Sequence, residues 1–190
     1  MTLLIGLTGF ARTGKSTAAA HLVEEHGLEG YAFANPIREA LAAMFNLDAS
    51  DFEGAKKEEL IPWLGRSPLQ LMQLLGTEWG RHMISANLWL DLAEQRLDGL
   101  ADSVGDTPGF VISDVRFENE AAFIRERGGV MVHMQRNDAS PVSAHSSEDG
   151  VAMHPQDLIV RNNGTIRELQ SELSSLVIYA RRRSSSRAAA

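Results

Sequence analysis

Hydrophobic positions along the chain fall into short apolar runs separated by longer amphipathic stretches. Each short run is of the length and apolar character that predict a buried strand. The five runs cover residues 3–7, 31–33, 110–114, 130–134 and 158–160. Because helical patterns separate them, the sequence predicts an α/β fold of three layers with a five-stranded parallel sheet.

The stretches between these runs carry the period of amphipathic helices. The predicted helices cover residues 15–26, 36–45, 68–81, 87–100, a segment ending at 127, and 165 to about 180. Thr165 and Glu168 have the spacing of a capping box, which supports a helix start there. Residues 181–190 are rich in Arg, Ser and Ala, and we expect a disordered tail.

Residues 9–17 join the first strand to the first helix and match G-x-x-x-x-G-K-[ST], the phosphate-binding loop. Gly9 and Gly14 allow backbone conformations in which several N–H groups point at one anion. The Lys15 ammonium would reach the β- and γ-phosphates, and the Ser16 hydroxyl would ligate Mg²⁺. The residues of this loop expected to contact ATP are Arg12, Thr13, Gly14, Lys15, Ser16 and Thr17.

The helix predicted at residues 68–81 carries polar side chains along one face. These residues are spaced 3, 4 and 4 apart: Gln70, Gln73, Thr77 and Arg81. The other sides are apolar and carry Leu71, Met72, Leu75 and Trp79, so we expect a buried helix. A polar stripe on a buried helix needs partners, either protein groups or a ligand. With Arg66 and Arg81 at its two ends, we favour a ligand.

Charged residues follow two of the predicted strands. Asp114 ends the strand at 110–114 and suits the acidic partner of a phosphate loop, holding Mg²⁺ directly or through water. Arg116 and Asn119 follow it, and Arg136 follows the next strand, at the sheet edge where open α/β sheets bind ligands. The polar segment 137–156, which includes His145, is typical of a mobile lid.

Composition narrows the class of protein. The 190 residues are 44% hydrophobic and 23% charged, and contain no cysteine, so we expect neither disulfides nor a thiolate metal site. The net charge of −7 argues against a specific nucleic-acid partner. No apolar run is long enough to span a membrane, and the first residues lack the pattern of a signal peptide. We therefore expect a cytoplasmic protein, in the host cytoplasm if it is phage-encoded, with no membrane association.

Several motifs in order resemble the bacteriophage-type deoxynucleoside monophosphate kinases of the P-loop kinase superfamily. Besides the loop, these motifs are Phe-Ala-Asn-Pro-Ile-Arg-Glu-Ala-Leu at 33–41, Leu-Leu-Gly-Thr-Glu-Trp-Gly-Arg at 74–81, Ser-Asp-Val-Arg-Phe-Glu-Asn-Glu at 113–120, His-Ser-Ser-Glu at 145–148 and Asn-Asn-Gly-Thr at 162–165. The resemblance implies transfer of the ATP γ-phosphoryl group to a deoxynucleoside 5′-monophosphate. It also implies one kinase domain over 1–180, with a monophosphate-binding helical insertion at 35–100 and a lid at 137–156.

The resemblance and the chemistry of phosphoryl transfer together assign roles to particular residues. The expected catalytic residues are Lys15, Asp114, Arg116 and Arg136, with Ser16 and Asp114 as Mg²⁺ ligands. Asn163 and Gly164 are expected to contact the ATP. The residues expected to bind the deoxynucleotide are Asn35, Arg38, Arg66, Gln70, Gln73, Thr77, Arg81, Trp89, Arg116, Asn119 and His145. Either Trp79 or Trp89 would stack on the base or crowd the sugar 2′ position.

Other functions share some of these features. A dephospho-coenzyme A kinase-like enzyme would have the same loop and general architecture, and a non-catalytic nucleotide-binding module would also use the loop. A GTPase-type switch is disfavoured, since it needs Asn-Lys-x-Asp and none of Lys15, Lys56 and Lys57 follows an Asn. The sequence leaves open which bases and sugars are accepted, which arginine acts in the transition state, and whether the chain forms a homodimer.

Overall fold

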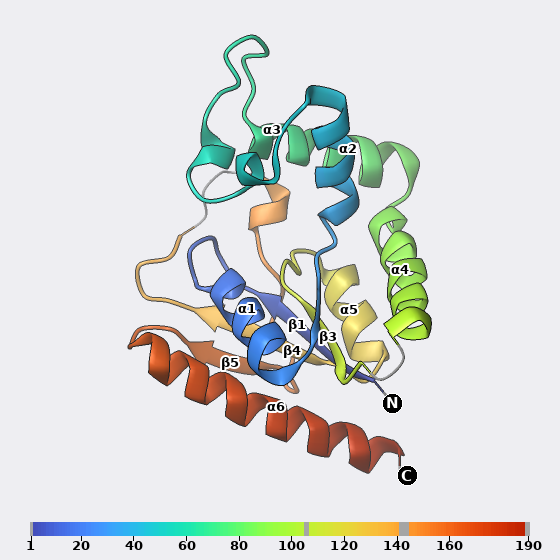
Figure 1. The fold of residues 1–190 in the computed structure, drawn as a ribbon, viewed down its shortest axis with the longest axis vertical. Helices are drawn as coiled ribbons and strands as arrows, with labels where there is room; N and C mark the ends of the chain where they lie inside the picture. Colours follow the sequence, from blue (N-terminus) through green and yellow to red (C-terminus); the bar gives the residue numbers. More distant parts are fainter. Residues whose placement is uncertain (1, 105–106, 141–144, 189–190) are drawn as a thin grey trace. The chain divides into compact units, whose positions relative to one another are not determined.

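The computed structural model of the protein describes residues 2–104, 107–140 and 145–188 (Figure 1). The chain divides into two compact units. The first, which we call the sheet unit, comprises Met1–Ala32 and Leu97–Ala190, and the second, the helical unit, comprises Phe33–Arg96. The predicted insertion at 35–100 has similar bounds to the helical unit; that it binds a monophosphate stays a prediction.

The sheet unit contains a five-stranded sheet with the order β2-β3-β1-β4-β5, in which every pair of neighbours is parallel. The strands are β1 (Leu3–Thr8), β2 (Glu29–Tyr31), β3 (Gly109–Ile112), β4 (Val130–Gln135) and β5 (Leu158–Arg161). The predicted five-stranded parallel sheet is therefore confirmed. Because β1 lies between β3 and β4, the segments that follow these three strands meet at one edge of the sheet.

Helices cover both faces of this sheet, as Figure 1 shows. On one face, α1 (Lys15–His26) and α6 (Ile166–Ala188) pack with Leu3, Ile5 and Leu7 of β1 in the main hydrophobic core. On the other face lies α5 (Glu118–Glu126), because a Cβ on Gly6 would meet Ile124 of that helix at 2.3 Å. The alternation of side chains along β1 thus fixes three layers, as predicted.

Two strand predictions differ from the structure. The second strand was predicted at 31–33 but covers Glu29–Tyr31, because its register pairs Glu29 with Phe110 and Tyr31 with Ile112. The third strand ends at Ile112, so Asp114 lies just beyond the sheet rather than at the last strand position. The side-chain pattern marks apolar runs, whereas the length of a strand depends on where its neighbour stops pairing.

The last helix also differs from its prediction. We expected α6 to end near Ala180 with a disordered tail, but it runs to Ala188. Arg183 donates to both Gln156 O (3.2 Å) and Gln156 Oε1 (2.7 Å), and Arg181 donates to His26 O at 3.4 Å. These contacts tie the basic segment to the sheet unit, and Arg and Ala are strong helix formers. In the described ranges no helix has the length and apolar content needed to cross a membrane.

The helical unit has its own hydrophobic core. Its elements are α2 (Asn35–Phe45), the short 3₁₀ turns η1 (Ala49–Phe52) and η2 (Lys56–Glu58), α3 (Pro68–Gln73), the π-helix η3 (Leu74–Ile84) and the start of α4 (Leu88–Val104). Its buried centre is formed by Ile37, Leu41, Phe52, Leu71 and Trp89. Ser67 and Gln70 form a capping box at the start of α3.

The predicted α-helix at 68–81 instead changes to a π-helix from Leu74 onward. Trp89 provides the physical reason: its indole N–H donates to Gly76 O at 2.7 Å, the carbonyl that Gly80 N would bond in an α-helix. The Trp89 ring also packs closely against Gly80, since a Cβ added to Gly80 would lie 2.4 Å from Trp89 Cζ2. A π-helix has a wider turn, so the predicted faces are not preserved, and Trp79 is 45% exposed rather than buried.

Candidate nucleotide-binding site

The loop between β1 and α1 has the backbone conformation that its glycines make possible. Gly9 has φ 137° and Gly14 has φ 96°, both in the region that favours glycine. A Cβ on Gly9 would lie 2.3 Å from Met134 O, and a Cβ on Gly14 would lie 2.4 Å from Asn162 Nδ2. The loop is therefore packed closely against the ends of β4 and β5, where no other residue fits.

The helix that follows the loop presents its N-terminus without a side-chain cap. Gly14 is its N-cap residue, and no side chain in the described chain accepts a hydrogen bond from this helix end. The first-turn N–H groups and the positive end of the helix dipole are available to an anion. Ser16 and Thr17 lie on this first turn and are exposed. This geometry suits a phosphate group.

Lys15 lies folded over the loop. Its ammonium donates to Gly9 O and Phe10 O, each at 2.7 Å. Thr13 has a structural role here, since its side chain is 1% exposed and its hydroxyl donates to Phe10 O at 2.9 Å. The ammonium is thus held at the loop centre, where it can neutralise a phosphate bound there. Of the two side chains, only that of Lys15 is placed to meet a ligand.

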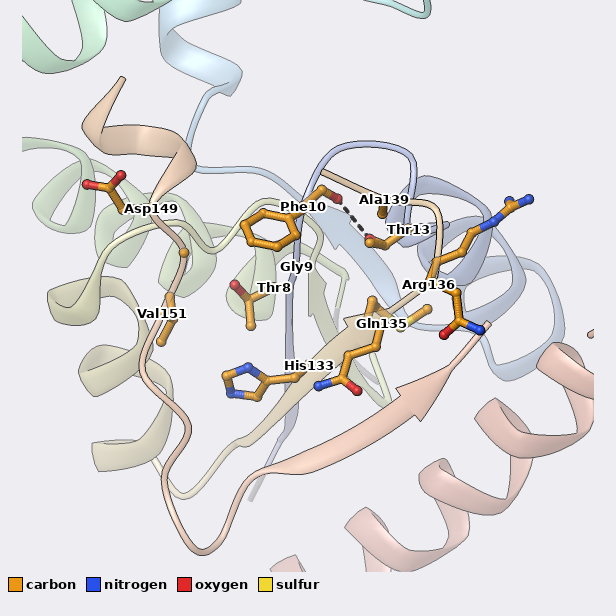
Figure 2. A pocket seen from close by; sticks show the side chains of 13 residues that line it. Thr8, Gly9, Phe10, Thr13, His133, Gln135, Arg136, Ala139, Asp149 and Val151 are labelled. Carbon is orange, nitrogen blue, oxygen red and sulfur yellow. Dashed lines mark hydrogen bonds between the residues drawn. The ribbon is translucent and has the colours of Figure 1, made fainter. Parts of the chain in front are cut away.

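A cavity of about 380 Å³ opens beside the loop within the sheet unit (Figure 2). Its lining comes from three segments: Thr8, Gly9, Phe10 and Thr13; His133, Met134, Gln135, Arg136, Asn137 and Ala139; and Asp149, Gly150 and Val151. Thr8 and His133 are paired across β1 and β4, so they form neighbouring points on its wall. Arg136 is a half-exposed member of the lining that pairs with Asp138 at 2.8 Å.

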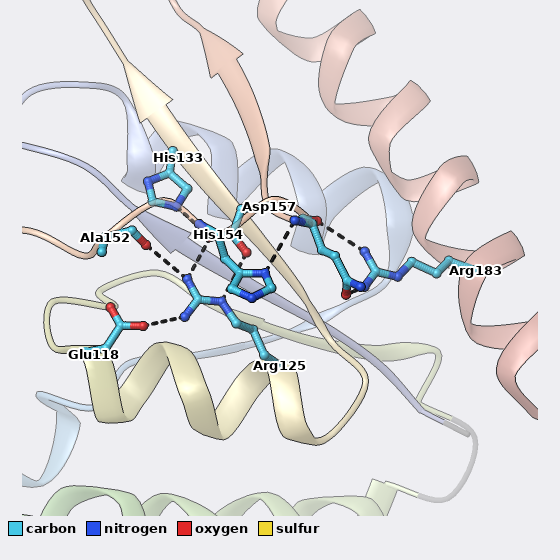
Figure 3. A network of polar contacts seen from close by, with 8 residues as sticks. Glu118, Arg125, His133, Ala152, His154, Asp157 and Arg183 are labelled. Carbon is cyan, nitrogen blue, oxygen red and sulfur yellow. Dashed lines mark hydrogen bonds and ion pairs between the residues drawn. The ribbon is translucent and has the colours of Figure 1, made fainter.

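A buried polar network supports this cavity (Figure 3). Asp157, whose side chain is 2% exposed, accepts from Arg125 Nη2 (2.7 Å), His133 Nε2 (3.0 Å) and the backbone N–H of His154 (2.9 Å). Burial raises the pKa of the Asp157 carboxyl, but these hydrogen bonds, led by that of Arg125, outweigh it and hold the pKa below its usual value. Asp157 in turn raises the pKa of Arg125. The carboxylate thereby fixes His133 against the cavity.

Other predicted residues of the sheet unit lie around the segments that follow β3, β4 and β5. Arg116 donates through Nη1 to Ser147 O at 3.0 Å and to the Glu148 carboxylate. His145 Nδ1 accepts from Ser147, through its hydroxyl at 2.9 Å and its backbone N–H at 3.2 Å. Asp114 and Asn119 are partly buried on the loop after β3 and the start of α5. Their roles toward a nucleotide stay predictions.

The turn after β5 reaches the phosphate loop, and it does so through a residue that we did not predict. Asn162 Nδ2 donates to Thr13 O at 3.1 Å, so this side chain supports the loop. Asn163 Oδ1 accepts from Asn137 N at 2.9 Å, and a Cβ on Gly164 would lie 2.2 Å from the Glu168 carboxylate. Thr165 and Glu168 form the predicted capping box. Nothing in the spacing of the sequence indicated that Asn162 contacts Thr13.

A metal site is supported only by the chemistry of two oxygen donors. Ser16 lies in the first turn of α1, which follows β1, and Asp114 follows β3, the strand paired with β1. Hydroxyl and carboxylate oxygens are the ligand types that Mg²⁺ prefers. Across the described ranges, no three His, Asp or Glu residues are grouped so as to hold a metal ion. Binding of Mg²⁺ by Ser16 and Asp114 therefore stays a prediction that also needs nucleotide oxygens as ligands.

In the helical unit, two predicted ligand contacts have structural roles. The Gln70 side chain accepts from Ser67 N at 3.0 Å, which completes the capping box of α3. Trp89 is 5% exposed in the core of the unit, so its indole packs under Gly80 rather than offering a face for a base. Thr77 is also buried, at 3% exposure. The pattern of polar residues could not separate helix caps and core positions from ligand contacts.

The arginines of this unit differ in how they are held. Arg81 donates to Ala86 O at 3.0 Å, which fixes its side chain across the end of η3. Arg66 is exposed, and its backbone forms an isolated antiparallel β-bridge with that of Ile61. Arg38 Nε is buried and has no hydrogen-bond partner in the described chain. A buried guanidinium nitrogen without a partner is what a bound anion would satisfy. Asn35 and Gln73 are partly buried on α2 and α3.

Comparison with known proteins identifies relatives over about nine-tenths of the chain. A sequence model of the deoxynucleotide monophosphate kinase family matches residues 63–173, more than half of the chain. An Acanthamoeba polyphaga mimivirus protein assigned the name of a deoxynucleotide monophosphate kinase is 31% identical over 194 residues, covering 92% of this chain and 96% of its own. The deoxynucleotide monophosphate kinase of Enterobacteria phage T4 is 23% identical over 236 residues, covering 90% and 97%.

Among solved structures, the chain is similar to an unliganded sugar kinase from Janibacter sp. HTCC2649. The TM-score is 0.46 with 15% sequence identity, over 90% of this chain and 92% of that one. A likeness at this level says nothing of the residues that bind a substrate.

Proposed function

The chain belongs to the deoxynucleotide monophosphate kinase family, and from that premise we propose that it transfers the γ-phosphoryl group of ATP to deoxynucleoside 5′-monophosphates. In this reaction an oxygen of the monophosphate forms a bond to the γ-phosphorus. The bond between that phosphorus and the bridging oxygen of the β-phosphate breaks, and the products are a deoxynucleoside diphosphate and ADP. The chain is thus an enzyme, a nucleotide kinase.

The single observation that supports the donor side is the phosphate loop with its uncapped helix and Lys15. The N–H groups of the loop and of the first turn of α1 would bind the β- and γ-phosphates, while Lys15 exchanges the carbonyls of Gly9 and Phe10 for phosphate oxygens. Ser16 and Asp114 would hold Mg²⁺, which neutralises phosphate charge when bound. Asn163 and Gly164 would contact the adenine end of ATP.

The acceptor side of the proposal depends on arginines, because a monophosphate is a dianion that pairs with planar guanidinium groups. The arginines proposed to contact the deoxynucleotide are Arg38, Arg66, Arg81 and Arg116. Arg38 Nε is buried and has no hydrogen-bond partner among the residues that the structure describes, which supports an anionic ligand for the helical unit. Asn35, Gln73 and Thr77 are proposed to contact the nucleoside. Of the two tryptophans expected to stack on the base, Trp79 is 45% exposed and Trp89 is buried, so Trp79 is the one proposed for this role.

The remaining parts of the proposal concern the segment 137–156 and the surroundings of the enzyme. As a lid, this segment would bring Arg136 and His145 to the nucleotides and exclude water, which would otherwise hydrolyse ATP. Residues 141–144 of the lid lie outside the described residues. A location in the cytoplasm, of the host if the chain is phage-encoded, and a homodimer belong to the same set of proposals.

The decisive test is a panel of all deoxy- and ribonucleoside monophosphates, each with ATP and Mg²⁺, with dephospho-coenzyme A as a further acceptor. We expect ADP and the matching deoxynucleoside diphosphate in equal amounts, together with loss of transfer when Mg²⁺ is chelated. Transfer to dephospho-coenzyme A alone would identify the alternative kinase. Absence of transfer from bound ATP in a single-turnover experiment would indicate a binding module and reject the proposal.

A further inference from the structure

A compact turn in the lid segment presents one carboxylate to the loop after β3. The turn η4 (Ser146–Glu148) is capped at its start by His145, whose Nδ1 accepts from Ser147. At its end, the backbone N–H of Glu148 donates to His145 O at 2.8 Å. These bonds fix the backbone of the turn. Its last side chain, Glu148, is only 5% exposed.

Ser147 and Glu148 together accept both hydrogens of one Arg116 nitrogen, Nη1. Nη1 of Arg116 carries two hydrogens; one is donated to Ser147 O at 3.0 Å and the other to the Glu148 carboxylate. Within the part of the chain that the structure describes, Nη2 and Nε of Arg116 donate to no protein group. A guanidinium group is planar and rigid, so fixing Nη1 also fixes the direction of these other donors.

The backbone of Arg116 is held as well. The Glu120 carboxylate accepts from Arg116 N at 2.7 Å and from Phe117 N at 3.0 Å, and Glu120 is itself 2% exposed. Arg116 is therefore fixed at both ends, while its side chain keeps 31% exposure. This combination of a fixed guanidinium group with unused donors is what recognition of an anion requires.

We propose that Glu148 is a positioning residue that orients Arg116 so that its Nη2 and Nε donors bind a phosphoryl oxygen of the deoxynucleotide. This inference rests on the proposed function, since it assigns Glu148 a task in the same reaction. Glu148 itself touches no substrate. Its carboxylate lowers the net charge near Arg116, but it removes the rotational freedom that a long arginine side chain would otherwise lose on binding.

The Glu148 carboxylate could instead compete with the phosphate for Arg116, and this role predicts a change of opposite sign in the KM for the deoxynucleotide. If Glu148 competed with the phosphate for Arg116, removing it would lower the KM for the deoxynucleotide. If Glu148 orients Arg116, removing it raises that KM. The sign of one kinetic constant thus separates the two roles.

Two replacements of similar size isolate the hydrogen bond. Glu148→Gln keeps an oxygen that can accept from Arg116 Nη1, whereas Glu148→Met keeps the buried volume and removes the acceptor. We expect Glu148→Met to raise the KM for the deoxynucleotide by about ten- to a hundredfold, the effect of one hydrogen bond to a charged group. Glu148→Gln should change it by less than about threefold, and neither should change the KM for ATP beyond that margin. Binding of the deoxynucleotide without ATP, measured by calorimetry, should weaken in the same order.

A double-mutant cycle with Arg116→Ala tests whether Glu148 acts through Arg116. In the Arg116→Ala background, Glu148→Met should cause no further change in the KM for the deoxynucleotide. Glu118→Ala is the matched control, because Glu118 pairs with a different arginine, Arg125, and should leave both KM values unchanged. If Glu148→Met does not fold, Glu148→Ala with a melting curve takes its place in the same cycle.

Three results would overturn the inference: an unchanged or lowered KM for the deoxynucleotide in Glu148→Met, an equal defect in Glu148→Gln, or additive defects in the double mutant. The substrate panel on the unaltered chain comes first. If that chain transfers no phosphate to any deoxynucleotide, the proposed function fails. If it does so and the variants match it, only the role of Glu148 fails.

Discussion

The phosphate loop of the sheet unit and the π-helix η3 of the helical unit both depend on glycines that let another group come close. Next to Gly9 the close group is a backbone carbonyl, Met134 O, whereas next to Gly80 it is the indole ring of Trp89. A backbone carbonyl inside a sheet cannot move away, but a side chain can change its rotamer. The loop is therefore rigid in form, while the shape of the π-helix follows from how one side chain packs.

The two elements therefore differ in what would contact a ligand. In the loop, the backbone itself supplies the donors, so its chemistry follows from its conformation. On the helix, the proposed contacts come from side chains, so its chemistry depends on which face each side chain occupies. The four predictions below test or sharpen that contrast, beginning with the largest expected effect.

Lys15→Ala should lower phosphoryl transfer by roughly 10³-fold, because it removes the one ammonium held at the centre of the loop. The fold should persist, since the loop conformation comes from glycines and backbone contacts. Steady-state kinetics with a deoxynucleotide, together with circular dichroism and a melting curve, measure both. Full activity in a folded variant would remove the loop from the mechanism.

Asp157→Asn should lower the free energy of unfolding by about 3 kcal/mol at neutral pH, because Arg125 and His133 lose their shared buried carboxylate. The Asp157 pKa is depressed in the folded chain. Its stabilisation is therefore complete above the ordinary value of 3.8 and is lost as the pH falls through the lower folded value.

Urea unfolding from pH 7 down to pH 3 measures this effect. The difference in free energy of unfolding between the unaltered chain and Asp157→Asn should narrow only at the acidic end of this range. Asp138→Asn is the control, since Asp138 is 72% exposed and its removal should cost less than about 0.5 kcal/mol. An equal loss in both variants, or a gap independent of pH, would show that the network beneath the cavity does not stabilise the fold.

Arg81→Ala should raise the KM for the deoxynucleotide by about tenfold or more, equivalent to about 1.5–3 kcal/mol for a hydrogen bond to a charged group. The KM for ATP should change much less, because the loop binds the donor without this residue. Both constants come from one kinetic matrix, with Arg66→Ala as the companion variant. An equal effect on both substrates would mean that Arg81 serves the donor.

Gly80→Ala should lower the free energy of unfolding by about 1–2 kcal/mol, because the new Cβ would meet the Trp89 ring at 2.4 Å. Gly99→Ala in α4 is the matched control of opposite sign. A Cβ there would meet nothing within 4 Å, so it should raise the free energy of unfolding by about 0.5–1 kcal/mol through helix propensity. If Gly80→Ala were stabilising too, the tight packing of Trp89 against η3 would be in error.

Several details of the site follow from the sequence because they depend on neighbours along the chain. The loop at 9–17, the helix Lys15–His26 and the Thr165–Glu168 capping box occur as predicted. In each case the interacting groups lie within a few residues of one another. The parallel sheet also follows from the sequence, because parallel neighbours must be joined by crossovers and helical patterns separate the predicted strands.

Details that failed or were missed depend on residues far apart in the chain. Trp89 was assigned to the base but lies in the core of the helical unit. The support of Thr13 by Asn162 and the pairing of Arg116 with Glu148 were not foreseen. Helical spacing shows which residues lie on the same face of a helix, but it does not show what packs against that face.

The sequence by itself determined the kind of fold and the chemistry of the loop, since glycine spacing and apolar runs act over short distances. Only the tertiary structure decided that η3 is a π-helix, that β3 stops before Asp114, and that Glu148 lies on Arg116. These features arise where one buried group competes for a hydrogen bond or a space with another from a distant segment. That competition is settled by packing in three dimensions, which residue order alone does not encode.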